Sequence, residues 1–374
     1  MEQLKKVWVA AFLCICGLTG WGNADSLVFI HHSVGENWLN HSLNDALVAK
    51  SYIDERNDIT YGTVIDPDSG RPGSLGSVPG DSTDMNHWIL WFNDYLDHVK
   101  AFDCESGVNR IIMFKSCFPN SNIWDDGVEP GDPFSGDFTL TNFKAIYRHP
   151  EGSGNTYTHD GHVYKPLEDI FAENSDTLFV PVTSPPLNYT STDDAAAHRA
   201  RLFNDWLKGE WLSSYNAAHP DLHNVAVFDL FNELAYADND FMHPNRLRGN
   251  YGGATGDSHP NDAANAHLTA VFATNSDDFI DAAWTAFGGE IEGEGEAEGE
   301  GEGEGEGEGE GEGEAEGEGE GEHNGGCFSG TFGHSSSGMS FRNAAGDGLL
   351  LMSVAIVLLL SKKTTASLST AQHN

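Results

Sequence analysis

A serine near residue 30 and a histidine near residue 260 are of the types that nucleophilic catalysis uses. Ser33 follows the apolar run Leu27-Val28-Phe29-Ile30, which predicts a short buried strand. A serine at a sharp turn from strand to helix exposes its hydroxyl. It also places its own N–H where developing negative charge is stabilised. The alternative role of Ser33 is to cap the helix that follows.

The second half of a candidate site lies in the segment Gly256-Asp257-Ser258-His259-Pro260-Asn261. A nucleophilic serine needs a base that takes its proton, and that base needs a carboxylate that fixes its tautomer. We therefore expect His259 to be the base of Ser33 and Asp257 to orient His259. The alternative is a surface turn in which Asn261 or Asp262 caps the next helix.

Five apolar segments alternate with helical patterns and predict the elements that must position these residues. The strands are expected at 27–30, 58–65, 110–114, 177–182 and 225–230, and the helices at 38–48, 85–99, 163–171, 193–215 and 261–286. Short apolar runs that alternate with helices are typical of an α/β fold with a doubly wound parallel sheet. Active sites of such sheets lie beyond the carboxyl ends of the strands.

Two long segments between these elements are rich in turn-forming residues. They span 66–83 and 119–158. Long loops at the catalytic edge commonly shape a substrate site. We expect Trp124, in the second loop, to form a platform for substrate, whereas tryptophans at helical spacing are expected in the core.

The order of these residues resembles that of the GDSL/SGNH hydrolase family. That family has Gly-Asp-Ser after its first strand, where this chain has His31-His32-Ser33. Its final block is Asp-x-x-His, and here Asp257-Ser258-His259 is one residue shorter. The serine and the histidine therefore match, while the residues beside them differ.

The two middle blocks of the family supply groups that bind the oxyanion. A glycine after the second strand corresponds to Gly80, with Gly76 as the second choice. An asparagine after the third strand corresponds to Asn120, with Asn122 as the second choice. The resemblance covers most of residues 25–287.

The resemblance implies a three-layer α/β/α flavodoxin-like domain that hydrolyses esters through an acyl-enzyme. In that mechanism Ser33 attacks the carbonyl carbon, His259 accepts its proton and Asp257 orients His259. The N–H groups of Ser33 and Gly80 and the amide of Asn120 would bind the oxyanion, each donor contributing about 10²–10³ in rate. Expected substrates are small-molecule or polysaccharide esters, and no cofactor is expected.

Adjacent histidines at the end of a strand point in opposite directions. We expect His32 to contact substrate, with a structural role for the other. Two metal-site alternatives stay open: His31 and His32 with the acidic end of the domain, and the cluster His159-Asp160-Gly161-His162. Because neither has the ligand spacing of a zinc site, no metal is predicted.

Three segments are expected to lie outside the folded domain of residues 25–289. Residues 1–24 have two lysines, an apolar run and small residues before Asp25, which predicts a signal peptide. A lipoprotein cleavage at Cys16 is the weaker alternative. Residues 290–322 carry Glu at every even position, and such a charged Gly-rich repeat is expected to be a disordered spacer.

The tail, residues 323–374, has an apolar run at 349–360 followed by Lys362-Lys363. This order is similar to that of bacterial C-terminal sorting signals, which a sorting protease cuts. The alternative is a simple tail anchor, although twelve apolar residues are short for a stable span. Both readings predict an exported domain, extracellular or on the cell surface, that meets the membrane only through this tail.

The charge and the cysteines agree with an exported hydrolase. The formal charge is −39, and −22 remains without the 17 glutamates of the repeat, which argues against nucleic-acid partners. The expected domain contains two cysteines, Cys104 and Cys117, for which a disulfide and two separate thiols are both open.

Two further functions remain open besides the esterase. One is a surface-displayed binding module that has the fold without a competent triad. The other is a metal-dependent hydrolase that uses the paired histidines.

Overall fold

Four parallel strands form the central sheet in the computed structural model, which describes residues 25–71, 75, 79–105, 107–149 and 156–289. Their order across the sheet is β2-β1-β3-β6. The strands are β1 (Asp25–Ile30), β2 (Ile53–Ile59), β3 (Asn109–Lys115) and β6 (Leu178–Val182). A separate antiparallel pair joins β4 (Tyr157–His159) to β5 (His162–Tyr164).

This strand order is that of a flavodoxin-like doubly wound sheet, so the predicted α/β fold is confirmed. The chain crosses from β1 to one edge at β2, returns to the other side at β3, and continues outward to β6. Val225 and Phe228 bridge β6 in parallel at the position of a fifth strand. The predicted strand at 225–230 is thus reduced to two bridges, because a helix already begins at Leu230.

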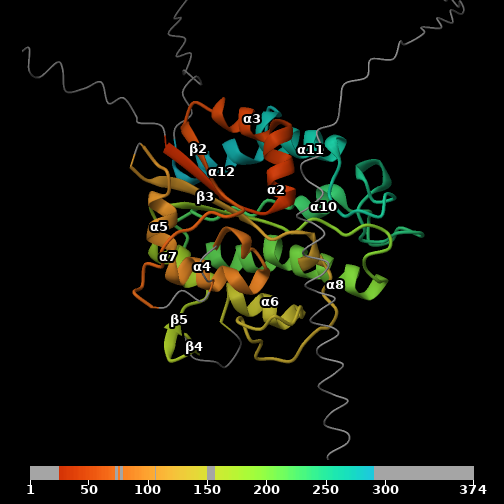
Figure 1. Cartoon of the computed structure of the whole chain (residues 1–374), viewed down its shortest axis with the longest axis horizontal. Coiled ribbons are helices and arrows are strands. Elements are labelled where there is room, and N and C mark those ends of the chain that lie inside the picture. The colour runs from red at the N-terminus through yellow and green to blue at the C-terminus, as the bar shows by residue number, and fades with distance from the viewer. Residues whose placement is uncertain (1–24, 72–74, 76–78, 106, 150–155, 290–374) are drawn as a thin grey trace, which may run out of the picture. The chain divides into compact units, whose positions relative to one another are not determined.

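Helices cover both faces of the sheet (Figure 1). One layer contains α2 (Ser33–Trp38), α3 (Asn44–Val48), α11 (Asp262–Thr269) and α12 (Phe279–Phe287). The other contains α4 (Trp88–Asp94), α5 (Leu96–Ala101), α6 (Leu140–Tyr147), α7 (Leu167–Glu173) and α8 (Asp194–Trp206). The remaining helices are α9 (Leu212–Ala218) and α10 (Leu230–Leu234).

Several helices continue into shorter turns. The π-helical turns are η1 (Leu39–Leu43), η5 (Leu207–Trp211) and η7 (Ala270–Thr274). The 3₁₀ turns are η2 (Pro79–Asp81), η3 (Met85–His87), η4 (Phe118–Ser121) and η6 (Gly249–Tyr251). Because α2, η1 and α3 follow one another without a break, they form one helical run directly after the first strand.

Successive residues of β1 enter two different cores, as the period of a strand requires. Leu27 and Phe29 pack in the core that contains Trp38 of α2. Val28 and Ile30 pack in the core that contains Trp88 of α4. All four strand residues are fully buried, so the end of β1 is held from both sides.

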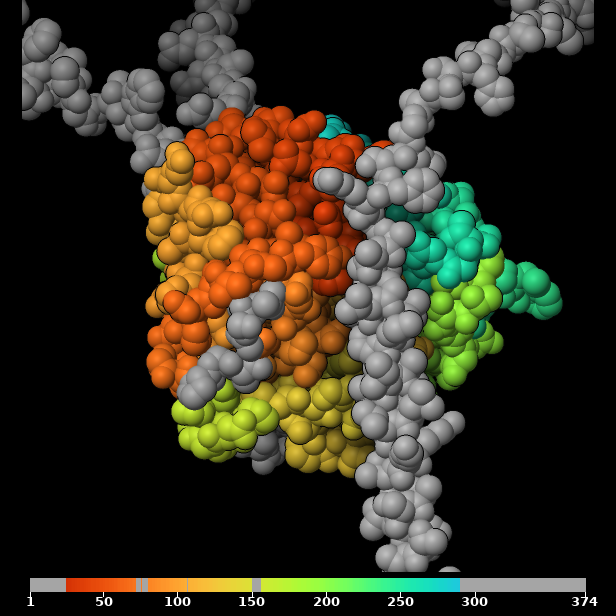
Figure 2. Space-filling model, viewed as in Figure 1, coloured from red at the N-terminus to blue at the C-terminus, as the bar shows by residue number. Residues whose placement is uncertain are grey.

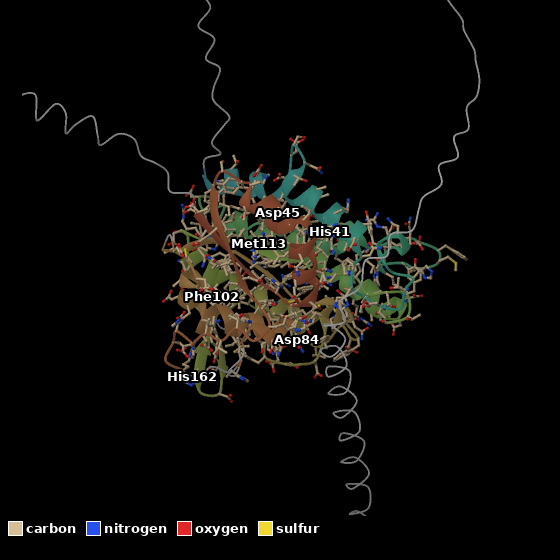
Figure 3. All side chains as sticks on the ribbon, turned by 45° about the horizontal axis from the view of Figure 1, so that its top comes forward. His41, Asp45, Asp84, Phe102, Met113 and His162 are labelled. Carbon is tan, nitrogen blue, oxygen red and sulfur yellow. The ribbon has the colours of Figure 1, made fainter. Side chains whose placement is uncertain are left out.

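The layers can be followed through single residues in Figure 3. Met113 of β3 lies in the middle. His41 and Asp45 lie on one side of it, in the first layer, and Phe102, at the end of α5, lies on the other side, in the second layer.

The red N-terminal surface and the blue-green C-terminal surface adjoin at the top of the molecule (Figure 2). There α11 packs against α2 and η1, although about 230 residues of sequence separate them.

Besides the fifth strand, four predictions need correction. The helix predicted at 261–286 divides into α11 with η7 and a separate α12, which Asp278 caps. The second strand covers Ile53–Ile59 rather than 58–65, because it is an edge strand whose middle is polar and half-exposed. The predicted helix at 163–171 divides into β5 and α7. The predicted loop 119–158 contains α6, whose N-terminus is capped by the Thr139 side chain.

Within the described ranges, no helix is long and apolar enough to cross a membrane. The predicted signal peptide, the Glu-Gly spacer and the apolar run at 349–360 all lie outside those ranges.

Candidate active site

The structure brings Ser33, His259 and Asp257 into one hydrogen-bonded chain. The Nε2 atom of His259 lies 2.9 Å from the Oγ atom of Ser33. Its Nδ1 atom lies 2.8 Å from the Oδ1 atom of Asp257. Because the carboxylate accepts the Nδ1 hydrogen, Nε2 is left as an acceptor for the serine hydroxyl. This is the arrangement of a nucleophile, its base and the group that orients the base.

Ser33 is placed by the turn between β1 and α2. His32 is the residue before the helix, and its carbonyl oxygen accepts hydrogen bonds from Gly35 N–H at 2.8 Å and Glu36 N–H at 3.1 Å. The His31 ring packs under this turn so closely that a Cβ on Gly35 would lie 2.4 Å from it. Gly35 is therefore required for the close approach between the helix and the strand end.

The buried His31 ring lies beneath the turn that carries Ser33. Its Nδ1 atom lies 2.9 Å from the His32 carbonyl oxygen, and its Nε2 atom lies 2.6 Å from Asp58 Oδ1. Both ring nitrogens therefore lie close to oxygen atoms, and Nε2 pairs with the Asp58 carboxylate. Burial alone would raise the pKa of Asp58, but His31 and Arg56 together lower it below its ordinary value.

The short spacing of Asp257 and His259 works through a local turn. Asp257 Oδ1 accepts both the His259 Nδ1 hydrogen and, at 3.1 Å, the His259 backbone N–H. Side chains of Asp commonly bond to their own backbone two residues on, which makes this an Asx turn. The Asp257 carboxylate therefore reaches the His259 ring although only one residue lies between them, one fewer than in the Asp-x-x-His spacing.

The carboxylate of Asp257 stays ionised despite its contact with the domain. Partial burial would raise the pKa of Asp257, but hydrogen bonds from the side chain and backbone of His259 lower it overall. The Asp257 side chain is 63 % exposed and that of His259 is 18 % exposed. The acidic end of the triad therefore lies at the surface, while the base is largely covered.

Ser258 anchors the segment between the two triad residues. Its buried Oγ atom accepts hydrogen bonds from the backbone N–H of Asn188 at 3.1 Å and from the Asn188 side-chain amide at 3.0 Å. Three residues further on, Asn261 caps α11 through a bond from Ala264 N–H. Asn261 thus has the capping role considered for this turn, and His259 still reaches Ser33.

Cys117 is a neighbour of Ser33 whose position the sequence did not reveal. It follows β3, is 7 % exposed, and its Sγ atom lies 3.4 Å from Ser33 Oγ. No disulfide joins it to Cys104, so of the two alternatives the separate thiols are observed. Burial would raise the pKa of Cys117, but hydrogen bonds from His32, Ser33 and Val34 and the charge of Lys115 lower it to about 6.

The two predicted oxyanion donors beyond Ser33 have other partners in the structure. The Asn120 amide donates to Asp84 Oδ1 at 2.9 Å, and its oxygen accepts from Met85 N–H at 2.8 Å. Gly80 N–H lies 3.4 Å from the carbonyl oxygen of Thr63. The second-choice Asn122 accepts a bond from Thr192, and Gly76 lies outside the described residues.

Aromatic rings lie beside His32 and His259, and Trp124, the other predicted substrate contact, is exposed. The His32 Nδ1 atom lies 3.2 Å from the Tyr61 hydroxyl, and the two rings are in contact. On the other side the Phe118 ring packs edge-on against the His259 ring, with centroids 4.9 Å apart. Trp124 is 49 % exposed and stacks on Phe138.

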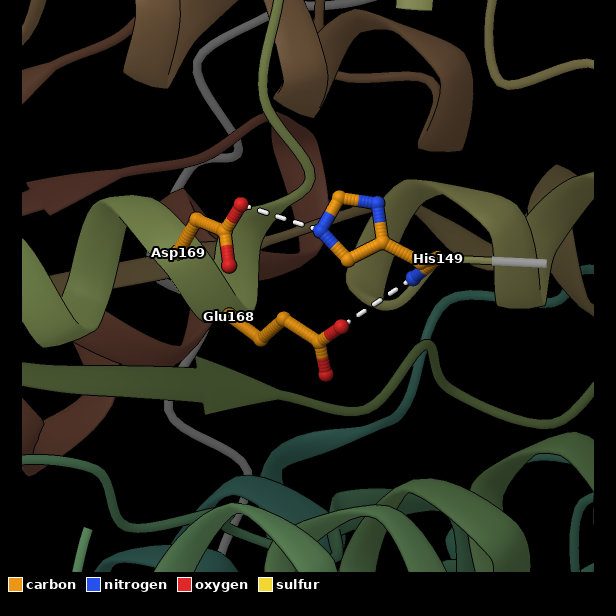
Figure 4. A group of neighbouring side chains, drawn as sticks. All are labelled: His149, Glu168 and Asp169. Atoms are coloured by element: carbon orange, nitrogen blue, oxygen red, sulfur yellow. Dashed lines mark hydrogen bonds and ion pairs between the residues drawn. The ribbon is translucent and has the colours of Figure 1, made fainter. Parts of the chain in front are cut away.

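The predicted histidine clusters do not form metal sites in the described part of the chain. His31 is paired with Asp58, and the His159 ring stacks on Phe134. One group of possible ligands does occur among the described residues, comprising His149, Glu168 and Asp169 (Figure 4). Glu168 and Asp169 lie in the first turn of α7, where acidic side chains are favoured. Glu168 accepts the His149 backbone N–H, and Asp169 pairs with the His149 ring at 2.9 Å.

Comparisons with known proteins find similarity only at a low level. No family model matches this chain, and no curated protein does. Among the solved structures that resemble it are a "putative acylhydrolase" from Bacteroides fragilis and a GDSL-like lipase from Bacteroides thetaiotaomicron. Their identities are 12 % and 10 %, and both TM-scores are 0.35. They cover 66 % and 70 % of this chain, and 84 % and 91 % of their own lengths are matched. At such values the fold rests on the sheet order of this chain.

Proposed function

We propose that this protein is an ester hydrolase that acts through an acyl-enzyme on Ser33. The observation that supports this most strongly is the pair of distances at His259, 2.9 Å to Ser33 and 2.8 Å to Asp257. A serine hydroxyl is a weak nucleophile until a neighbouring base removes its proton. Here the base has the right tautomer for that task, because its other nitrogen donates to a carboxylate.

The proposed reaction has two stages. Ser33 attacks the ester carbonyl while His259 takes the hydroxyl proton and passes it to the leaving alcohol. Water activated by the same histidine then releases the acid. We assign the oxyanion to Ser33 N–H at the start of α2; Gly80 and Asn120 would join it after leaving Thr63 and Asp84 on substrate binding.

The substrate and the location belong to the same proposal. We propose an exported or surface-displayed enzyme acting on small-molecule or polysaccharide esters, with His32 and the exposed Trp124 contacting the substrate. The location rests on the composition of residues 1–24 and 323–374. Mass spectrometry of the mature chain tests the N-terminal part, since cleavage of the signal peptide would leave Asp25 first.

A fluorophosphonate probe tests the proposed nucleophile directly. Wild-type protein should be labelled and should hydrolyse a short p-nitrophenyl ester, whereas Ser33→Ala should lose both by about 10⁴-fold or more. Ser213→Ala, on the exposed side of α9, is the matched control and should behave as wild type. A wild-type protein that is folded, unlabelled and inert on esters would contradict the proposal and favour a binding module.

A further inference from the structure

The Ser33 hydroxyl has two neighbours but only one hydrogen. His259 Nε2 lies 2.9 Å from its oxygen on one side, and Cys117 Sγ lies 3.4 Å from it on the other. His259 Nε2 can only accept, because Nδ1 donates to Asp257. A sulfur atom can donate as a thiol or accept as a thiolate. The direction of the Ser33 hydrogen therefore depends on the state of Cys117.

The surroundings of Cys117 favour negative charge on the sulfur. The His32 side chain and the Val34 N–H both hydrogen-bond to it. Lys115, two residues earlier at the end of β3, is fully buried and bonds to the Ser116 carbonyl oxygen at 3.1 Å. Burial lowers the pKa of Lys115 to about 8, and the negative charge of Cys117 acts against this lowering.

We propose that Cys117 is a positioning residue for Ser33. As a thiol it leaves the serine hydroxyl donating its hydrogen bond to His259, and as a thiolate it accepts that hydrogen bond itself. This inference rests on the proposed acyl-enzyme chemistry of Ser33. The thiol donates its hydrogen to Ser33 Oγ and leaves the hydroxyl aimed at its base. The thiolate accepts the hydroxyl hydrogen and also places a negative charge beside the atom that attacks the carbonyl.

The sign of the pH dependence follows from these contacts. Below the pKa of Cys117, about 6, the sulfur is a thiol and Ser33 is directed to His259. As pH rises through that value the thiolate forms and the reactivity of Ser33 falls, by up to about tenfold per pH unit. The titratable groups that act on the sulfur are His32 and Lys115, and His259 acts through Ser33.

The test is the rate of fluorophosphonate labelling as a function of pH in four proteins: wild type, Cys117→Ser, Cys117→Ala and Cys104→Ser. Wild type and Cys104→Ser, the matched control, should lose reactivity above about pH 6. Cys117→Ser keeps a neutral donor at all these pH values and should stay reactive, as should Cys117→Ala. The ultraviolet absorbance of the thiolate, as the difference between wild type and Cys117→Ser, gives the titration of the sulfur independently of catalysis.

Each outcome decides between the two proposals. If wild type is labelled without an alkaline fall, or with one that both Cys117 variants keep, the role of Cys117 is overturned and the esterase proposal stands. A fall whose midpoint differs from that of the thiolate absorbance also overturns it. If no protein is labelled at any pH, both proposals fail. Should one Cys117 variant not fold, as judged by its thermal unfolding, the other and the absorbance titration decide.

Discussion

The two halves of the triad are held in place by different kinds of contact. Ser33 follows a strand buried in two cores and lies above an ion pair whose histidine is fully covered. Asp257 and His259 lie on a loop, and hydrogen bonds over two residues hold them together. The serine half is therefore rigid because of core packing, whereas the histidine half depends on a few polar contacts near water.

This difference separates effects on catalysis from effects on folding. Changes in the exposed loop should alter the reaction while the domain stays folded. Changes beneath Ser33 should alter stability, because they leave a buried charge without its partner. The four predictions below test this contrast.

Replacement of His259 by alanine should have the largest effect. Without a base Ser33 keeps its proton, and kcat/KM for an activated ester should fall by about 10⁴-fold or more. The free energy of unfolding should change little, because the ring packs on Phe118, which belongs to neither of the two hydrophobic cores. His267→Ala, a surface histidine of α11 that pairs with Glu233, is the control and should stay active. A loss below tenfold for His259→Ala would contradict the assignment of the base.

Replacement of Asp257 by asparagine should reduce kcat by about 10²-fold. The amide oxygen can still accept the backbone N–H of the Asx turn, but it no longer stabilises the imidazolium that forms in the reaction. Loss of a buried triad aspartate costs about 10⁴-fold. We expect less here because water reaches a carboxylate that is 63 % exposed and already screens its charge. A fall in kcat as large as that of His259→Ala would show that water does not screen the charge of this exposed carboxylate.

Replacement of Asp58 by asparagine should lower stability at neutral pH by about 2 kcal/mol, because it leaves the buried His31 ring without its ion pair. The lowered pKa of Asp58 means that its carboxylate stabilises the fold above its ordinary pKa. That contribution disappears as pH falls through the lowered value. Urea unfolding of both proteins should therefore show a difference at neutral pH that shrinks below about pH 4.

Asp45→Asn, on the exposed side of α3, is the matched control for this measurement. Its stability should differ from wild type by less than about 0.5 kcal/mol. Equal effects of the two substitutions, or a difference for Asp58→Asn that does not depend on pH, would argue against the ion pair beneath Ser33.

Replacement of Ser258 by alanine should have the smallest effect. Two donors of Asn188 lose their common acceptor, which should cost about 1 kcal/mol of stability. The turn through Asp257 still holds His259, so kcat should fall only a few-fold. Thermal unfolding and ester hydrolysis measure the two effects. A loss of activity equal to that of Asp257→Asn would mean that Ser258, rather than the Asx turn, places the base.

The elements that the sequence predicted well are those with strong apolar patterns. The first, third and fourth strands and the helix after Asp193 are within a few residues of their predicted places, because buried segments have continuous apolar runs. The edge strand β2 and the capped helix α6 were missed. Their residues are polar on the exposed side, and the pattern there does not differ from that of a loop.

The site residues also divide into those that the sequence could indicate and those that it could not. Ser33 and His259 could be selected because each has the type and setting that the chemistry requires. The hydrogen bond of Asn120 to Asp84 and the contact of Cys117 with Ser33 could not. Both depend on which side of a strand end a side chain faces, and a shift of one residue reverses that direction.

The sequence by itself therefore determined the α/β class, the order of the strands along the chain, and the serine and histidine that could react. Apolar runs and their spacing carry the fold class. The serine and the histidine were selected by their places after a strand and before a helix, in the order that the family resemblance implies. Only the tertiary structure decided that Asp257 reaches His259 across a shortened turn, that His31 pairs with Asp58, and that a thiol lies against Ser33. The last two contacts join residues at or just beyond the ends of different strands, and Cys117 is 84 positions from Ser33. They exist only when the carboxyl ends of β1, β2 and β3 lie side by side in the sheet.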